Sequence, residues 1–351
     1  MLSKAFSTIW PILLALLFFG IIIMTHEFGH FIFAKIFKVK VNEFSIGMGP
    51  ALFKKKKGDT DYALSLFPIG GYVAMEGEDE DSADENSFNN KPAWQRAIII
   101  IAGATINILT GVIIMAIILS SSKLIGTPSI AEFAKDATSS SYGLEEGDRI
   151  VAINGNKIYT EYDLSYFMMR DKDAVIDFVV ERDGKMMPLR SVKFDTEKIE
   201  GHTVVKYDFS ILGVKPDFKN VVKYSFMNSF SVARIVAVSF ADLVTLNFSL
   251  NDLSGPVGTV DIIADTTSEA VHTMNFTSLL NMMAFIAINI GVFNLIPFPA
   301  LDGGRFFLIA IEGVTGKKVP AKVEAAINAT GLILLLGLMV VVTINDIIKF
   351  F

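Results

Sequence analysis

Three ionisable residues lie inside an apolar stretch that otherwise covers residues 5–34, and they constrain the fold more than any other feature. They belong to the pentapeptide HEFGH at residues 26–30. Ionisable side chains at membrane depth are costly and are usually functional. On a helix, His26 and His30 are about one turn apart on one face, so both imidazoles can bind one Zn²⁺. Glu27 lies beside them and can take a proton from a zinc-bound water.

Two other interpretations of this motif are weaker. A chance HExxH is disfavoured because the chain has only four histidines. A histidine pair buried for packing is disfavoured because lipid offers it no hydrogen-bonding partners. The motif therefore favours a zinc metalloprotease.

The composition, 52% hydrophobic and 19% charged, is outside the range of ordinary soluble proteins. Four uncharged runs are long enough to span a bilayer, namely 6–25 continuing through the HExxH motif, 97–122, 275–301 and 325–345. A fifth run, 224–250, is interrupted by Arg234 and Asp242, and we interpret it as an interfacial or partly embedded amphipathic helix. We expect an α-helical polytopic membrane protein with about four transmembrane helices.

Lysine and arginine near the ends of the spans predict the orientation. They follow the first run, precede the second and lie between the last two, as Lys35, Lys38, Lys40, Lys91, Arg96, Arg305, Lys317, Lys318 and Lys322. No lysine or arginine occurs in residues 235–304. We therefore expect the basic loops to face the cytoplasm, and both termini and the region from about 123 to 272 to lie outside it.

The charge and the cysteine count exclude several classes. A formal net charge of −6 argues against nucleic-acid binding. Part of this charge lies in residues 76–85, a run that usually indicates a solvated, flexible loop. The absence of cysteine leaves histidine and carboxylate as the only strong zinc ligands.

A membrane-associated β-hairpin region is expected between the first two spans. Residues 42–47 and 62–66 have strand character, 54–59 form a plausible turn, and 68–72 predict a turn or re-entrant loop. An exposed strand edge near a protease site can bind substrate by β-addition, although a plain cytoplasmic hairpin is an equally good interpretation of the pattern alone.

A small α/β domain is predicted from about residue 126 to residue 216. The sequence GLEEGDRIVAING at residues 143–155 reads as a loop, an alternating strand and a turn, and 161–170 can form a short helix. Strands are expected at 174–181 and 187–194, joined by the hairpin signal Asp183-Gly184. This order resembles a PDZ domain of the bacterial protease type, which would take an extended peptide by strand addition or act as a size filter.

The third zinc ligand has to come from another segment, because a catalytic zinc commonly keeps three protein ligands. The third apolar run ends in NLIPFPALDGG at residues 294–304. Pro297 and Pro299 cannot continue a helix, so we expect the chain to unwind there. Asp302 follows at the same end of the membrane as His26 and His30, and is the best candidate. The alternative is an ordinary aspartate at a helix terminus.

HEFGH and NLIPFPALDGG together resemble the paired signatures of the site-2 proteases, the intramembrane zinc metalloproteases. The resemblance extends over nearly the whole chain through segments 44–50, 68–72, 91–96 and 253–258. It is to the bacterial RseP/RasP-type branch with one PDZ domain between the second and third spans. The family pattern GPxxN reads GATIN at residues 103–107, so the proline is absent and Asn107 remains.

The resemblance implies hydrolysis of peptide bonds within transmembrane segments of single-span proteins in the bilayer, such as anti-sigma factors and remnant signal peptides. It implies a multi-pass protein of the bacterial cytoplasmic membrane with its active site toward the cytoplasm. Candidate substrate-binding residues are Asn107, Asn294, Gly70, Gly71, Tyr72 and Val73. The two asparagines could bind the unwound substrate or the oxyanion, or make structural interhelical hydrogen bonds.

Four regions are expected: 1–125 with the HExxH helix, hairpin and second span, 126–216 as the PDZ-like domain, 217–272 as an amphipathic linker, and 273–351 with the last two spans. The rival from another class is a non-proteolytic membrane scaffold with a PDZ domain and a structural zinc site. The base Glu27 argues against it, since a structural site has no use for a base. A metal transporter is disfavoured because the last span is almost free of polar residues.

Overall fold

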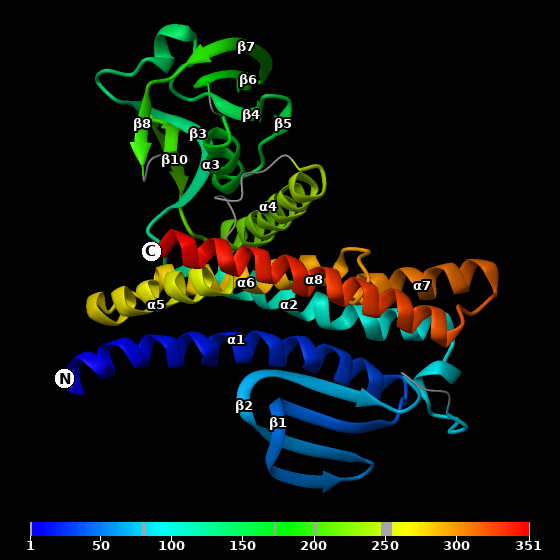
Figure 1. The fold of residues 1–351 in the computed structure, drawn as a ribbon. Coiled ribbons are helices and arrows are strands. Elements are labelled where there is room, and N and C mark those ends of the chain that lie inside the picture. Colours follow the sequence, from blue (N-terminus) through cyan, green and yellow to red (C-terminus); the bar gives the residue numbers. More distant parts are fainter. Residues whose placement is uncertain (1, 79–81, 172, 200–201, 247–254, 351) are drawn as a thin grey trace. The chain divides into compact units, whose positions relative to one another are not determined.

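The computed structural model describes residues 2–78, 82–171, 173–199, 202–246 and 255–350 (Figure 1). The chain forms two compact units. The first contains Met1–Gly111 together with Phe240–Phe351, and the second contains Val112–Ser239. The predicted motif residues of the metal site all belong to the first unit, whereas the predicted PDZ-like region belongs to the second.

The first unit is mainly helical. Its helices are α1 (Leu2–Ile36), most of α2 (Ala93–Ser121), α5 (Pro256–Thr273), α6 (Thr277–Leu295), α7 (Asp302–Thr315) and α8 (Ala321–Phe350). In the described part of the chain, five helices are long and apolar enough to cross a membrane: α1, α2, α6, α8 and also α4 (Phe218–Val244). The lengths and composition of these helices agree with the expected polytopic membrane protein.

The number of such helices differs from the expected four. The additional helix, α4, overlaps the run that we interpreted as interfacial because of Arg234 and Asp242. Arg234 is paired within the second unit, where its Nη1 lies 3.1 Å from the fully buried carboxylate of Asp163. A charge with such a partner interrupts an apolar helix less than the sequence suggests. Residues 247–250 of the predicted run lie outside the described residues.

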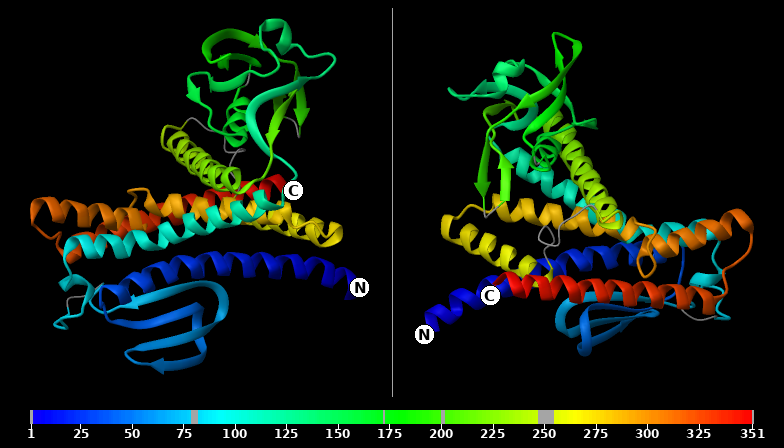
Figure 2. Two further views of the ribbon diagram at one scale, coloured as in Figure 1. Left: turned by 180° about the vertical axis from the view of Figure 1, so that it is seen from behind. Right: turned by 45° about the horizontal axis from the view of Figure 1, so that its top comes forward.

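The chain segment that connects α1 to α2 forms a folded sheet of two long strands. Strand β1 (Val41–Lys57) and strand β2 (Thr60–Met75) both bend, so that residues 41–46 pair with 71–75 on one side and 43–46 pair with 61–64 on the other. Residues 51–57 pair with 60–65. The order across the sheet is therefore 51–57, 60–65, 41–46 and 71–75. Figure 2 shows this sheet along the C-terminal half of α1.

Two details of the hairpin prediction were wrong. The lysines at 54–57 belong to β1, and the tight turn is limited to Gly58 and Asp59. Residues 68–72 belong to β2 rather than to a turn or re-entrant loop. Gly70 has a φ of +84°, which lets the strand bend there, and the chain then continues by pairing with 41–46. That pairing is with a distant segment, so the local Pro-Gly-Gly signal could not reveal it.

The end of α1 shares a hydrophobic core with the sheet, with the start of α2 and with α7. Its buried residues come from these elements and from the connections next to them, which include the 3₁₀ turn Phe88–Asn90: Ala34, Val39, Val41, Met75, Phe88, Ile99, Ile100 and Ile309. Because each element buries an apolar face against the others, this core fixes their relative positions around the C-terminal end of α1.

The predicted unwinding at the two prolines is confirmed. Helix α6 ends at Leu295, and the chain is irregular until α7 begins at Asp302. Gly303 and Gly304 explain how α7 can begin so close to the irregular segment before it. A Cβ on Gly303 would lie 2.2 Å from the carbonyl oxygen of Ile296, and a Cβ on Gly304 would lie 2.4 Å from that of Phe298. Only glycine lets the first turn of α7 pack this closely on the preceding loop.

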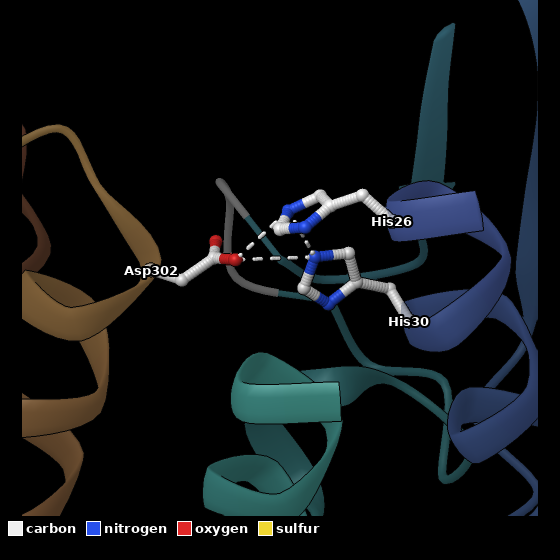
Figure 3. Close-up of side chains that lie close together, drawn as sticks. All are labelled: His26, His30 and Asp302. Atoms are coloured by element: carbon white, nitrogen blue, oxygen red, sulfur yellow. Dashed lines mark hydrogen bonds and ion pairs between the residues drawn. The ribbon is translucent and has the colours of Figure 1, made fainter. Parts of the chain in front are cut away.

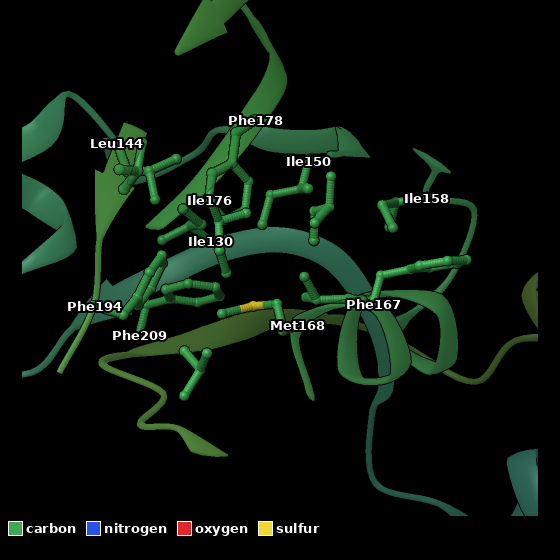
Figure 4. Close-up of a cluster of buried hydrophobic side chains, with 14 of the residues drawn as sticks. Ile130, Leu144, Ile150, Ile158, Phe167, Met168, Ile176, Phe178, Phe194 and Phe209 are labelled. Atoms are coloured by element: carbon green, nitrogen blue, oxygen red, sulfur yellow. The ribbon is translucent and has the colours of Figure 1, made fainter. Parts of the chain in front are cut away.

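The second unit contains a six-stranded sheet in the order β10-β3-β4-β6-β7, with β5 paired to β4. Its strands are β3 (Ile125–Phe133), β4 (Arg149–Ile153), β5 (Asn156–Lys157), β6 (Val175–Arg182), β7 (Lys185–Lys193) and β10 (Phe209–Val214). Helix α3 (Glu161–Met169) and the hairpin of β8 (Thr196–Ile199) and β9 (His202–Val205) complete the regular structure, apart from the 3₁₀ turn Ser139–Tyr142 and α4. Buried side chains from the sheet and α3 form one core (Figure 4).

The local predictions for this unit agree with the structure. The hairpin between β6 and β7 turns at Asp183 and Gly184, whose φ values are +49° and +74°. Helix α3 and strands β4, β6 and β7 lie within a residue or two of their expected positions. Strands β3, β5, β8, β9 and β10 were not predicted.

Candidate metal centre

The HExxH motif lies on the continuous helix α1, with both histidines buried against α2. Close approach of these helices depends on two glycines. A Cβ on Gly29 would lie 2.6 Å from the carbonyl oxygen of Ala102. A Cβ on Gly103 would lie 2.4 Å from His30 Nε2 and 2.9 Å from His26 Cε1. The imidazoles therefore rest on the bare backbone of α2.

Three potential ligand atoms from two distant segments meet at one point (Figure 3). His26 Nε2 and His30 Nε2 are 3.2 Å apart. Asp302 Oδ2, at the start of α7, lies 3.1 Å from His26 Nε2 and 3.3 Å from His30 Nε2. The structure thus brings together the three residues that the sequence predicted as zinc ligands.

The spacing of these atoms fits a zinc ion. Ligands bound tetrahedrally at about 2.0–2.1 Å from Zn²⁺ are roughly 3.3 Å from one another. All three observed separations are close to that value. Asp302 Oδ2 is also buried and accepts no hydrogen bond of proper geometry from the described residues, although both imidazoles are within ion-pair distance. A buried carboxylate oxygen that lacks a hydrogen-bond donor is suited to binding a cation.

Both imidazoles have a partner at the ring nitrogen that faces away from Asp302. His30 Nδ1 lies 2.9 Å from the carbonyl oxygen of Ile99 on α2. A carbonyl only accepts, so Nδ1 carries the proton and donates it, and in the neutral imidazole Nε2 then keeps its lone pair. His26 Nδ1 lies 3.5 Å from the side-chain amide of Asn107, which is fully buried.

The orientation of the Asn107 amide follows from its second neighbour. Thr25 Oγ1 donates its only proton to the carbonyl oxygen of Ile22 at 2.7 Å. It lies 3.0 Å from Asn107 Oδ1, while Asn107 Nδ2 faces His26 Nδ1, so in this orientation of the amide two acceptors meet at Thr25. An amide turned with its nitrogen toward Thr25 and its oxygen toward His26 Nδ1 satisfies every group. In that arrangement His26 also keeps its Nε2 lone pair free.

Glu27 is half-buried, and its carboxylate makes no hydrogen bond or ion pair with any described residue. Gly71 of the sheet lies close to it, because a Cβ there would be 3.5 Å from Glu27 Cγ and 2.8 Å from the carbonyl oxygen of Ser45. The absence of a side chain at Gly71 therefore leaves the carboxylate beside an open stretch of backbone. A carboxylate without a partner is free to accept a proton.

The remaining predicted site residues are placed as follows. Gly70, Gly71, Tyr72 and Val73 lie on the 71–75 edge of the sheet or at the bend before it. The Tyr72 hydroxyl donates to Glu43 Oε1 at 2.6 Å, and Val73 packs on the core at the end of α1. Asn294, near the end of α6, is half-buried, and its amide has no hydrogen-bond partner among the described residues.

Sequence reasoning missed four residues that hold the histidines: Gly29, Ile99, Gly103 and Thr25. Ile99 acts through its backbone, which no sequence pattern indicates. Gly103 was noticed only as part of the GATIN segment. A glycine in an apolar helix can mark close helix packing, and that signal could have identified it.

The fold and the site together define a polytopic membrane protein with a His₂Asp cluster and an unpaired glutamate beside it. The sequence model of peptidase family M50 matches residues 14–338. A candidate zinc metalloprotease of Clostridium acetobutylicum is 34% identical over 343 residues, covering 96% of this chain and 97% of the relative. The zinc metalloprotease RasP of Geobacillus kaustophilus is 28% identical, covering 98% and 99% of the two chains.

A further relative, the regulator of sigma-W protease RasP of Bacillus subtilis, is 28% identical over 418 residues, covering 96% of this chain and 98% of the relative. The chain belongs to peptidase family M50. It is a zinc metalloprotease of the site-2 type, and zinc is its metal.

Proposed function

We propose that His26, His30 and Asp302 hold the zinc ion and that Glu27 is the general base of an intramembrane protease. The observation that carries this assignment is the meeting of three ligand atoms, 3.1–3.3 Å apart, next to a carboxylate without a partner. A zinc ion bound by such ligands lowers the pKa of water and stabilises negative charge on an attacked carbonyl oxygen.

The protein side chains supply the proton transfers and the orientation. Glu27 accepts the proton of the attacking water and delivers it to the leaving amine. Ile99 and Asn107 hold the imidazole protons on Nδ1, so both Nε2 atoms face Asp302 with their lone pairs. The role of Asn107 is therefore to orient His26. Asn294, whose amide is free, is the better candidate for binding the substrate backbone.

Substrate binds in extended form along residues 70–73. Residues 71–73 lie on the open edge of the sheet, and Gly71 lets that edge come close to Glu27. A transmembrane helix has all its peptide bonds internally hydrogen-bonded, so it has to unwind before hydrolysis. Pairing with the edge replaces some of the lost hydrogen bonds and presents a peptide bond to the base.

The substrates are transmembrane segments of single-span proteins, including anti-sigma factors and remnant signal peptides. The relative whose name links it to sigma-W regulation supports the first class. The distribution of lysine and arginine supports a cytoplasmic-membrane protein with the metal site toward the cytoplasm. With α1, α2, α6 and α8 as the crossing helices, both termini lie outside.

The region 126–216 is a PDZ-like domain that filters substrates by size. Support comes from the GLEEGDRIVAING segment and from the order of β4, α3, β6 and β7 after it. Deleting the domain should let the enzyme cut substrates whose outer domains are intact. Slower cleavage of pre-trimmed substrates by a folded deletion variant would instead indicate that the domain recruits peptide ends.

The proposed activity is tested with the purified protein and a synthetic transmembrane peptide, with and without a zinc chelator. We expect cleavage that the chelator abolishes and that added zinc restores. A protein that binds zinc but cleaves no transmembrane peptide would favour the scaffold function and overturn the proposal.

A further inference from the structure

The turn that follows β2 is joined to α7 by an ion pair. Arg305 Nη1 lies 2.5 Å from Glu78 Oε1, and the two side chains are only 21% and 12% exposed. Arg305 follows Asp302 by three residues, which places both on one face of α7 about one turn apart. Glu78 belongs to the acidic run that the sequence suggested to be a solvated loop, and it instead contacts the helix that begins with the third ligand.

The position of Glu78 is itself fixed relative to the HExxH helix. The turn is closed by Glu78 N–H, which donates to the carbonyl oxygen of Met75 at 3.3 Å. It is tied to its neighbours by Glu76 N–H, which donates to the carbonyl oxygen of Lys40 at 2.9 Å, and by Phe88 N–H, which donates to that of Glu76 at 2.7 Å. A few residues earlier, Gly71 on the same strand lies against Glu27. The strand and its turn therefore connect the catalytic base to the helix that carries Asp302.

A second ion pair joins α7 to α2. Arg96 Nη2 lies 2.5 Å from Glu312 Oε1, with side chains 5% and 15% exposed. Arg96 precedes Ile99 by three residues, and the Ile99 carbonyl contacts His30. Helix α7 is thus held at two positions on one face, two turns apart. Arg305 is paired with Glu78, on the turn after the strand that lies against Glu27, and Glu312 is paired with Arg96, one turn before the carbonyl group that contacts His30.

We propose that Glu78 and Arg305 are positioning residues that set Asp302 opposite His26 and His30. The irregular segment before α7 is held by backbone hydrogen bonds within itself and by the Asn328 side chain of α8, contacts that do not involve α1 or its sheet, whereas metal ligands tolerate displacements of only about 0.2 Å. The ion pair supplies the missing constraint, and it links the location of the substrate-binding strand to that of the third ligand. This inference rests on the proposed ligand role of Asp302.

The experiment measures the zinc dissociation constant of the full-length protein by competition with a chelator. Glu78→Gln and Arg305→Gln should each weaken zinc binding about 10-fold, as is usual when a group that orients a ligand is removed. The double variant should bind about as weakly as Arg305→Gln, because Glu78 acts through Arg305. Arg305 also lies 3.8 Å from Glu324, so its substitution is expected to cost at least as much zinc affinity as that of Glu78. Arg305→Lys, which keeps the charge, should lose less.

Glu85→Gln is the matched control, because it removes the same charge from an exposed residue of the same acidic run. Its zinc affinity should stay within twofold of the wild type. Unchanged affinity in Glu78→Gln, additive effects in the double variant, or an equal loss in Glu85→Gln would each overturn the proposal. If Arg305→Gln does not fold, Glu78→Gln and Arg305→Lys decide the matter. Zinc affinity is read without a substrate, so failure of the protease activity would leave this result standing.

Discussion

Gly103 gives the sharpest test of the proposed metal centre, because the site leaves no room for a methyl group there. In Gly103→Ala the new Cβ would lie 2.4 Å from His30 Nε2, whereas ordinary contact begins at about 3.4 Å. The ring has to move by about 1 Å, several times the roughly 0.2 Å that metal ligation tolerates. The movement also pulls His30 Nδ1 away from the carbonyl oxygen of Ile99.

The expected result is a folded protein with a damaged metal site. Alanine is favoured over glycine in a helix by up to about 1 kcal/mol, and the clash is with the end of a side chain that can swing away. The thermal midpoint of the metal-free protein should therefore change little. Zinc binding should weaken at least 10-fold, about 1.4 kcal/mol, and proteolysis should fall with it.

The assay is chelator competition for zinc, run beside Gly337→Ala. Gly337 is also in an apolar helix, but a Cβ there would meet no atom within 4 Å. The control should bind zinc as the wild type does. Wild-type zinc affinity in Gly103→Ala would refute the reasoning, since the imidazole would then not lie where the ligand geometry requires it.

Three further substitutions test individual roles. Glu27→Gln should abolish proteolysis and leave about one zinc per chain by metal analysis, whereas loss of the zinc would show that Glu27 is a ligand. Asp302→Ala should lose both zinc affinity and activity, and full activity in this variant would mean that another carboxylate binds the metal. Asn107→Ala should destabilise the protein by about 1–3 kcal/mol in denaturant titration, because buried groups on Thr25 and His26 lose their partner; an unchanged midpoint would contradict that network.

The sequence was sufficient to select the three residues that meet at the candidate site, because each has a strong local signature. The histidines share one helix face, and Pro297 and Pro299 force α6 to end before Asp302. The packing that holds the ligands was not predictable in the same way. Ile99 contributes a backbone carbonyl, and Arg305 finds Glu78 across 227 residues of sequence. Such contacts depend on tertiary arrangement, which no local pattern encodes.

The same distinction explains the errors in the sheet. The Asp183-Gly184 turn was predicted correctly because its conformation depends on two adjacent residues. Residues 68–72 were expected to turn because Pro and Gly usually interrupt strands. They continue β2 because residues 41–46 supply a partner for the strand that follows.

The folded sheet has two edges that differ in how readily they can pair with another polypeptide strand. One edge, 51–57, carries the exposed lysines Lys54, Lys55, Lys56 and Lys57, and lysine on an edge strand discourages pairing with another chain. The other edge, 71–75, contains Gly71 next to Glu27. In the proposed binding mode, the lysines therefore favour pairing of an unwound polypeptide at 71–75 over pairing at the opposite edge, and they also disfavour edge-to-edge pairing with a second copy of the chain.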